Sequence, residues 1–185
     1  MRRVLSFAAL TLIALASTAS AQRTTRSSMA SANPSPEIGV DGALIFGLDD
    51  PNTTTLSVPV QRIRVGFFLS PTISLEPTFG ITTISGGGDR VTTYSIGTGL
   101  LWHFAPSRAA NQLYLRPFVD FNGASFSGAG SDNSVTFGAG FGIKHPIRDR
   151  FNTRLEGLFG HTGEHSGLPS SNDLGVLFGF SVYTR

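Results

Sequence analysis

Apolar residues occupy every second position in eight successive runs between Glu37 and Tyr183. Each run has about the length that crosses a bilayer as a tilted β-strand, roughly 9–11 residues. In the fourth run, one face carries Tyr94, Ile96, Thr98, Leu100, Trp102 and Phe104, and the other carries Ser95, Gly97, Gly99, Leu101 and His103. The alternation predicts an all-β fold, namely an eight-stranded antiparallel up-and-down transmembrane β-barrel.

The other seven runs are defined by their apolar faces. In chain order these faces are Ile38, Val40, Leu44, Phe46; Ile63, Val65, Phe67, Leu69; Ile73, Leu75, Phe79, Ile81; then, after the fourth run, Leu113, Leu115, Val119, Phe121; Val135, Phe137, Ala139, Phe141, Ile143; Phe151, Leu155, Phe159; and Leu174, Val176, Phe178, Phe180, Val182. The alternation breaks once, because Leu56 and Val60 have even numbers whereas Ile63 and its successors have odd numbers. We therefore expect a bulge near residues 59–62, or an early part of that run that lies outside the membrane.

Polar connections of two kinds separate the runs. Those at residues 70–72, 105–112 and 146–150 would be the periplasmic turns of a barrel threaded from the periplasm. The others are polar and rich in glycine and would be the outer loops, at residues 49–55, 85–90, 125–133 and 161–173.

Periodicity alone does not say which face of the barrel points inward. A soluble surface usually carries about 25–35% charged residues, whereas charged residues make up 14% of this chain and Lys144 is its single lysine. The polar face is instead rich in glycine. Small residues suit an eight-stranded lumen, because it is only just wide enough for side chains to fill. Composition therefore favours a membrane barrel whose apolar face meets lipid.

The N-terminus has the composition of a secretory signal peptide. Two arginines precede an apolar stretch, and small residues end at Ala21, so we expect residues 1–21 to be a signal peptide cleaved after Ala21. Residues 22–36 are polar and lack an apolar period, which predicts a disordered periplasmic segment before a barrel of residues 37–185. Basic and acidic side chains would balance in the mature chain, which gives no support to a nucleic-acid partner.

Ten charged residues fall on the polar face of the predicted strands. They are the acids Glu37, Asp41, Glu76, Asp120 and Glu156 and the bases Arg62, Arg64, Arg116, Lys144 and Arg154. Toward lipid, each Arg or Lys near the midplane would cost about 2–4 kcal/mol, so we expect the whole set to point inward. Buried charges need opposite partners. The sequence therefore predicts an ion-pair cluster that closes the lumen near its periplasmic end, below a wet vestibule of small residues; a gated polar pathway is the alternative.

Residues 37–185 resemble the eight-stranded outer-membrane barrels of bacteria, the class of the outer-membrane protein A transmembrane domain and of outer-membrane protein X. Gly175, Phe178 and Phe180 carry part of the resemblance, because they fit the family's C-terminal assembly signal, although Ser181 and four further residues follow. The resemblance implies a monomer in the bacterial outer membrane, surrounded by lipid and lipopolysaccharide. Its implied partners during assembly are periplasmic chaperones and the barrel-assembly machinery.

Three enzyme-like signals are present but incomplete. The string from His161 to His165 matches the H-x-x-E-H motif of zinc peptidases, which needs a helix that the neighbouring glycines and proline disfavour. With Ser166 and Asp173, the same segment supplies residue types of lipid-modifying outer-membrane enzymes, but without a matching spacing. His103, beside the single tryptophan, is interpreted as an interfacial side chain and not as a base.

We therefore expect a non-enzymatic outer-membrane barrel without cofactor or metal, whose structural or adhesive role is exerted through its outer loops. The main rival is a narrow channel or small-molecule carrier, and a lipid-modifying enzyme at the outer rim comes third. A channel would conduct in planar bilayers, and a lipid enzyme would alter lipid A. The acidic outer loops suggest either solvated charge or divalent cations that bridge lipopolysaccharide.

Overall fold

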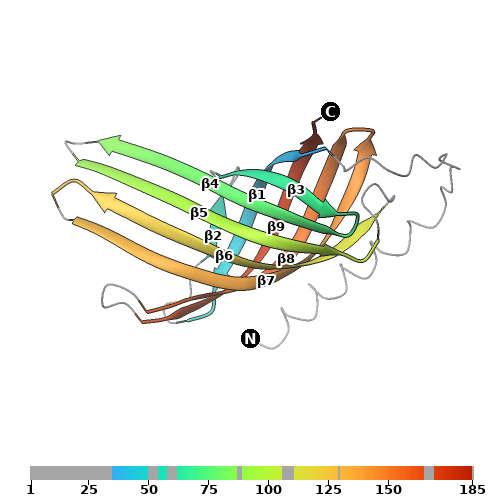
Figure 1. The fold of residues 1–185 in the computed structure, drawn as a ribbon. Coiled ribbons are helices and arrows are strands. Elements are labelled where there is room, and N and C mark those ends of the chain that lie inside the picture. Colours follow the sequence, from blue (N-terminus) through green and yellow to red (C-terminus); the bar gives the residue numbers. More distant parts are fainter. Residues whose placement is uncertain are drawn as a thin grey trace, which may run out of the picture. The chain divides into compact units, whose positions relative to one another are not determined.

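The computed structural model describes residues 35–49, 54–57, 62–86, 89–105, 111–128, 130–164 and 169–184. The strands (Figure 1) are β1 (Glu37–Gly47), β2 (Thr54–Ser57), β3 (Arg62–Ser70), β4 (Ile73–Gly86), β5 (Asp89–His103), β6 (Gln112–Phe126), β7 (Gly130–Arg148), β8 (Phe151–Thr162) and β9 (Ser171–Tyr183). No helix in the described ranges is long and apolar enough to cross a membrane. The predicted signal peptide, its cleavage position after Ala21 and residues 22–34 lie outside the described residues.

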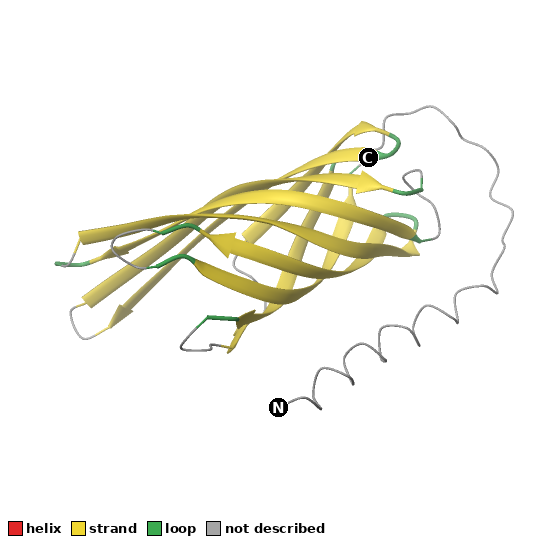
Figure 2. Cartoon of the chain, turned by 90° about the horizontal axis from the view of Figure 1, so that it is seen from below, coloured by secondary structure: helices red, strands yellow, loops and turns green. Residues whose placement is uncertain are grey.

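The sheet closes into a barrel because its last strand pairs with its first. β1 is antiparallel to β9 along its whole length, from Glu37 opposite Tyr183 to Gly47 opposite Asp173. β2 and β3 both pair with β1 and form consecutive parts of one barrel strand. From β3 to β9, each strand pairs with the next in chain order. The closed eight-stranded up-and-down barrel (Figure 2) confirms the predicted fold class.

The barrel strand formed by β2 and β3 is interrupted between them. Ala43 is opposite Ser57 and Val40 is opposite Ile63, so two residues of β1 lie between these pairs where the other part of the chain has five. This excess of three residues is an odd number, which accounts for the change of parity between Leu56 and Ile63 in the sequence. Residues 58–61 themselves lie outside the described ranges.

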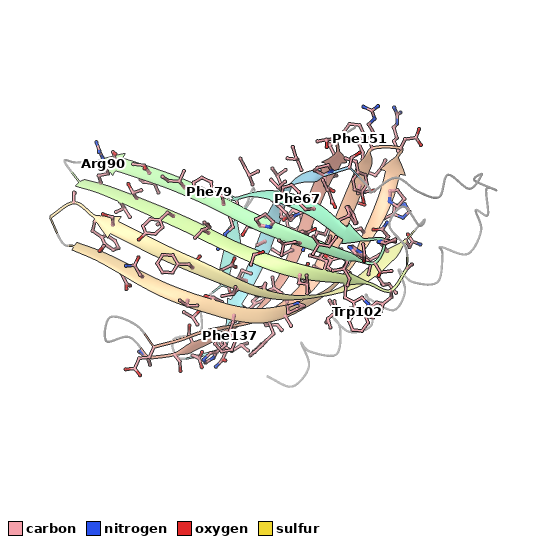
Figure 3. The ribbon with its side chains drawn as sticks, in the orientation of Figure 1. Phe67, Phe79, Arg90, Trp102, Phe137 and Phe151 are labelled. Atoms are coloured by element: carbon pink, nitrogen blue, oxygen red, sulfur yellow. The ribbon has the colours of Figure 1, made fainter. Side chains whose placement is uncertain are left out.

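Lipid-facing and lumen-facing side chains alternate along the strands, as in transmembrane barrels. Leu100 exposes 43% of its surface on the outside of β5, whereas its neighbour Leu101 is fully buried on the lumen side. Many large apolar side chains are exposed around the outside, among them Phe67, Phe79, Trp102, Phe137 and Phe151 (Figure 3). An apolar surface that surrounds the barrel is stable in lipid but not in water.

Two hairpins and one turn differ from the sequence prediction. The hairpins β4–β5 and β6–β7 continue almost to their tips, so most residues of the predicted outer loops 85–90 and 125–133 belong to strands. At the opposite end, here called the inner end, β7 continues to Arg148, and the predicted turn 146–150 shortens to residues 149–150. Glycine and serine in these segments signal turns locally, but pairing between long neighbouring strands overrides that preference.

Four strands extend beyond the others at the outer end. The pairing of β4 with β3 ends at Gly80 and that of β7 with β8 at Thr136, but β4 to β7 stay paired with one another to their tips. Figure 1 shows these ends as two adjacent hairpins. We call this part the projecting sheet; it consists of residues 81–86, 89–94, 123–126 and 130–133.

The apolar outer surface ends within the projecting sheet, at Ile81. Its outward positions include a row of hydroxyl side chains across the four strands, namely Thr83, Thr92, Ser125 and Ser131. Its other face carries the apolar row Ile84, Val91 and Phe126. Because its outward face is polar, this sheet belongs in water beyond the bilayer.

Adjacent positions on β5 provide a direct test of side-chain orientation. The chain contains no cysteine, so Leu100→Cys and Leu101→Cys each introduce a single thiol. In lipid vesicles we expect a lipid-soluble maleimide to label position 100 strongly and position 101 hardly at all, because only the first side chain faces lipid. The extent of labelling is measured by mass spectrometry. Equal labelling at both positions, or stronger labelling at position 101, would contradict the orientation of these side chains.

Candidate functional site

Eight of the ten charged residues predicted to face the lumen form one connected network. We call it the ion-pair plug; its members are Glu37, Asp41, Arg64, Glu76, Arg116, Lys144, Arg154 and Glu156. These residues come from six strands, β1, β3, β4, β6, β7 and β8, so the network crosses the lumen. Four acids face four bases, which leaves the plug without net formal charge.

Glu76 is the centre of the plug. Its carboxylate lies 2.7 Å from Lys144 Nζ, 2.9 Å from Arg154 Nη1 and 3.3 Å from Arg64 Nη1. All four side chains are at most 2% exposed. Hydrogen bonds between ionised groups are the strong ones in proteins, so a carboxylate with three cationic donors is held firmly in place.

Glu37 connects the plug to the seam where the barrel closes. Its carboxylate accepts hydrogen bonds from Lys144 Nζ at 2.7 Å and from Arg64 Nη1 at 3.2 Å. It also accepts one from Ser181 Oγ of β9 at 2.5 Å. Arg64 reaches Asp41 as well, with its Nε 3.1 Å from that carboxylate. First and last strands are thus joined by side chains as well as by their backbones.

Glu156 holds the other side of the plug. It pairs with Arg116 at 2.5 Å and with Arg154, and it accepts a hydrogen bond from Tyr114 Oη at 2.6 Å. The Tyr114 ring is fully buried and lies 5.2 Å from the Arg154 guanidinium carbon and 5.8 Å from Lys144 Nζ. Sequence analysis did not single out Tyr114. Its shared parity with Arg116 on the lumen face of β6 was the signal that could have identified it.

An aromatic layer lies between the plug and the inner end. Phe68 stacks on His103 with ring centroids 5.8 Å apart, and Tyr183 and Tyr114 contact this pair. His103 is 1% exposed, and its Nε2 lies 3.1 Å from Ser74 Oγ. The prediction of an interfacial His103 is therefore wrong. The imidazole occupies the lumen-side position of the last β5 residue and helps to fill the lumen.

The remaining two charged residues, Arg62 and Asp120, form a separate pair nearer the outer end. Arg62 Nη1 lies 2.8 Å from the Asp120 carboxylate, and its Nη2 lies 2.8 Å from Asn122 Oδ1. These side chains are 29% and 15% exposed, unlike the central members of the plug. The structure thus places the ten predicted residues in one buried network of eight and one partly exposed pair.

The lumen face needs glycine where the plug approaches the wall most closely. An ideal Cβ on Gly99 would lie 2.9 Å from Arg116 Cγ and Cδ, and one on Gly140 would lie 2.6 Å from the Glu156 carboxyl carbon. Real Cβ atoms are not found so close to their neighbours, so a larger residue would displace the plug. These glycines therefore provide the space that the long charged side chains occupy.

We expect Gly140→Ala to destabilise the barrel by about 1–3 kcal/mol, the usual cost of overpacking a filled interior. Gly157→Ala is the matched control, because a Cβ there meets no atom within 4 Å. Urea unfolding in lipid vesicles measures both. A control variant that loses as much stability as Gly140→Ala would mean that the close approach to Glu156 is not the cause.

A cavity of about 260 Å³ lies on the outer side of the plug. Its lining residues are Asp41, Ala43, Ile45, Arg62, Arg64, Thr78, Arg116, Phe118, Asp120, Asn122, Thr136, Arg154, Leu158, Gly160, Asp173 and Leu177. A vestibule of small residues was expected here, but Ile45, Leu158 and Leu177 also line it. Sequence analysis missed these three, because single apolar residues on the polar face of a strand do not disturb its alternation.

Among the residues that the structure describes, the enzyme-like signals do not form a catalytic group. His161 Nδ1 lies 2.9 Å from Asn172 Oδ1, and the His161 ring packs on Phe137. His165 and Ser166 lie outside the described residues. Within the part of the chain that the structure describes, no group of three or more His, Cys, Asp or Glu side chains is placed to hold a metal ion.

The residues of the proposed assembly signal all lie in β9. Phe178 and Phe180 are exposed on the lipid side. Gly175 is on the lumen side, where Ile45 and Leu158 pack over it. Recognition of this segment by the barrel-assembly machinery stays a prediction.

Neither a protein-family model nor the sequence of a curated protein matches the chain. The fold is similar to that of surface protein A of Neisseria, with a TM-score of 0.63 and 15% identity over 80% of this chain and 97% of that one. It is also similar to Ail, the attachment invasion locus protein of Yersinia pestis, with a TM-score of 0.50 and 11% identity over 83% of this chain and all of that one. The predicted resemblance to small outer-membrane barrels is confirmed at the level of the fold.

Three features of the structure define the class of protein. They are the closed topology of the sheet, its apolar outer surface and its charged interior. The chain is a small transmembrane β-barrel of the bacterial outer-membrane type. That the inner end faces the periplasm and the projecting sheet the outside of the cell stays a prediction.

Proposed function

We propose that this protein is a non-enzymatic, non-conducting barrel that acts at the cell surface through its projecting sheet. The observation that carries the proposal is the extension of β4 to β7 beyond their neighbours, which creates a paired sheet that extends beyond the apolar belt. Outer loops were expected to carry the interaction. The projecting sheet now takes that place, because only two residues separate β4 from β5 and only three separate β6 from β7.

The outward hydroxyl row of the projecting sheet supports a role in binding other molecules. Thr83, Thr92, Ser125 and Ser131 lie side by side across its four strands. A hydroxyl group both donates and accepts hydrogen bonds, so this row can bind a polar partner. One of the similar structures belongs to a protein whose name refers to attachment and invasion.

The ion-pair plug supports the absence of a pore. Separating its pairs would expose several charges in a lumen of low polarity, and breaking even one buried pair typically costs about 3–5 kcal/mol. The rival interpretation as an open channel requires such a step for every opening. A lipid-modifying enzyme finds no support in the geometry around His161.

Shortening the projecting sheet tests the proposal. Ile81 and Tyr94 are opposite each other, so residues 82–93 can be replaced by an Asn-Gly turn that suits a two-residue hairpin. Bacteria that produce this variant should adhere several-fold less to cultured epithelial cells than bacteria with the full chain. The double variant Thr83→Ser/Thr92→Ser keeps the hydroxyl row and should adhere normally.

Surface amounts of each protein must first be equal, as measured by labelling of intact cells. Adherence that is the same with the full chain, the shortened chain and no protein would contradict the proposed role. Steady, large conductance of the purified full chain in planar bilayers would favour the channel instead.

A further inference from the structure

The cavity above the plug has two chemically different walls. Its apolar wall comes from neighbouring strands, with Ala43 and Ile45 on β1, Leu158 on β8 and Leu177 on β9. The facing wall is polar. We propose that this cavity binds a small organic carboxylate with an apolar body, which enters from the outer end.

The apolar wall is built for contact with a nonpolar group. An ideal Cβ on Gly175 would lie 3.3 Å from Leu158 Cδ1 and would overlap Ile45 Cδ1. Glycine at this position thus gives space for both side chains on the lumen side. When a nonpolar group covers apolar side chains that would otherwise contact water, the free energy of the system falls.

The polar wall offers hydrogen-bond donors that have no acceptor. Thr78 Oγ1 is buried and has no hydrogen-bond partner in the described part of the chain. Among the same residues, Arg116 bonds Glu156 through Nε and Nη2 only, and Arg62 uses Nη1 and Nη2 but not Nε. Arginine has no acceptor atom. The polar group of the ligand must therefore be an acceptor, as a carboxylate is.

Size narrows the ligand further. The four guanidinium groups of the lining are already paired with carboxylates of the plug or with Asp120, so the ligand is selected by the N–H groups that these pairs leave unused and not by an excess of positive charge. A water molecule occupies about 30 Å³ in the liquid, so 260 Å³ accommodates an organic molecule of roughly ten non-hydrogen atoms. The ring of Phe118 lies beneath the Arg116 guanidinium at 4.6 Å, so apolar and donor groups meet at one point of the lining.

The proposed site does not depend on the proposed surface function. It borders the outer side of the plug and uses an N–H group of Arg116 that the plug leaves unbonded, so binding does not require the plug to open. Binding here would therefore neither require nor cause passage across the membrane, and loss of adherence by the shortened sheet would leave the site intact.

Phenylacetate is the probe that matches these constraints, with phenethylammonium as a probe of similar size and opposite charge. The protein, in lipid nanodiscs, carries ¹³C-labelled Ile and Leu methyl groups, and each probe is titrated in turn. We expect saturable shifts of the Ile45, Leu158 and Leu177 methyl signals with phenylacetate alone. Lipid-facing Leu100 reports any general effect of the probe on the bilayer.

Two variants connect the shifts to the cavity. Thr78→Val removes one donor with little change in shape and should weaken phenylacetate binding about threefold to tenfold, the usual effect of one hydrogen bond. Ala43→Phe fills the cavity and should abolish saturation, whereas Ala139→Phe, which adds the same ring on the lipid side of β7, should bind as the natural chain does.

The results of these titrations either support the proposed site or overturn it. Saturable shifts that Ala43→Phe abolishes and Ala139→Phe preserves support the site. No saturable shift with phenylacetate, equal shifts with phenethylammonium, or equal shifts at Leu100 would each overturn it. If Ala43→Phe fails to fold, an unchanged affinity in Thr78→Val would also overturn it.

Discussion

Glu76→Ala is expected to lower the free energy of unfolding by about 3–5 kcal/mol, the cost of leaving buried charges without their partner. Its carboxylate is the shared partner of Lys144, Arg154 and Arg64, so its loss leaves four bases facing three acids inside the barrel. Urea unfolding in lipid vesicles, followed by tryptophan fluorescence, measures the change. For a domain of ordinary stability, about 5–15 kcal/mol, this is a large fraction.

A double variant separates charge imbalance from loss of packing. Glu76→Ala/Lys144→Met restores three acids against three bases, and the remaining ones keep a partner within the plug. We expect it to recover at least about 1 kcal/mol of the loss. Asp120→Ala, in the partly exposed pair outside the plug, should cost about 1 kcal/mol or less. A double variant that is no more stable than Glu76→Ala would contradict the paired arrangement.

Removing two members of the plug that pair with each other should open the lumen and leave no buried charge without a partner. In Glu37→Ser/Lys144→Ser, Arg64 keeps Asp41 and Glu76, and Arg154 also keeps Glu76. Two long, buried side chains are replaced by short polar ones, and water can occupy their space. We expect conductance steps in planar bilayers to become at least about tenfold more frequent, which corresponds to ~1.4 kcal/mol in the opening equilibrium.

The pair outside the plug provides the control for this experiment. Arg62→Ser/Asp120→Ser removes the same number of charges but leaves the buried network intact, so its conductance should stay as low as that of the natural chain. If both double variants conduct equally often, the plug is not the barrier. If the natural chain already conducts steadily, the lumen is not closed.

The fold could be predicted from sequence because the side-chain period of a strand is two and lipid accepts only one of its faces. The same rule placed Glu76 and Arg116 inside the barrel without any knowledge of their partners. Which acid meets which base depends on the stagger between neighbouring strands. Glu37 and Lys144 are in contact, although more than a hundred residues separate them, and no local pattern contains that information.

The projecting sheet and the cavity could not be predicted for a different reason. Glycine, serine and threonine are frequent both in loops and in a strand that is exposed to water, so composition does not distinguish the two at the tips of β4 and β5. Leu177 and Ile45 lie on strands whose opposite faces are even more apolar, and a single strand does not show that they converge. Tyr114 was missed because an aromatic residue near a strand end resembles a membrane-interface residue.

Glu37 is the first residue of β1, and its carboxylate is bound by Lys144 of β7 and Ser181 of β9. One neighbour of the first barrel strand is therefore the strand that is synthesised last. Until β9 docks on it, Glu37 lacks its Ser181 contact, and the charges of the lumen lie beside an open seam that water can enter. Sealing the interior against ions and pairing the first barrel strand with the last are thus a single event. A barrel interrupted one strand before completion would be leaky as well as unfinished.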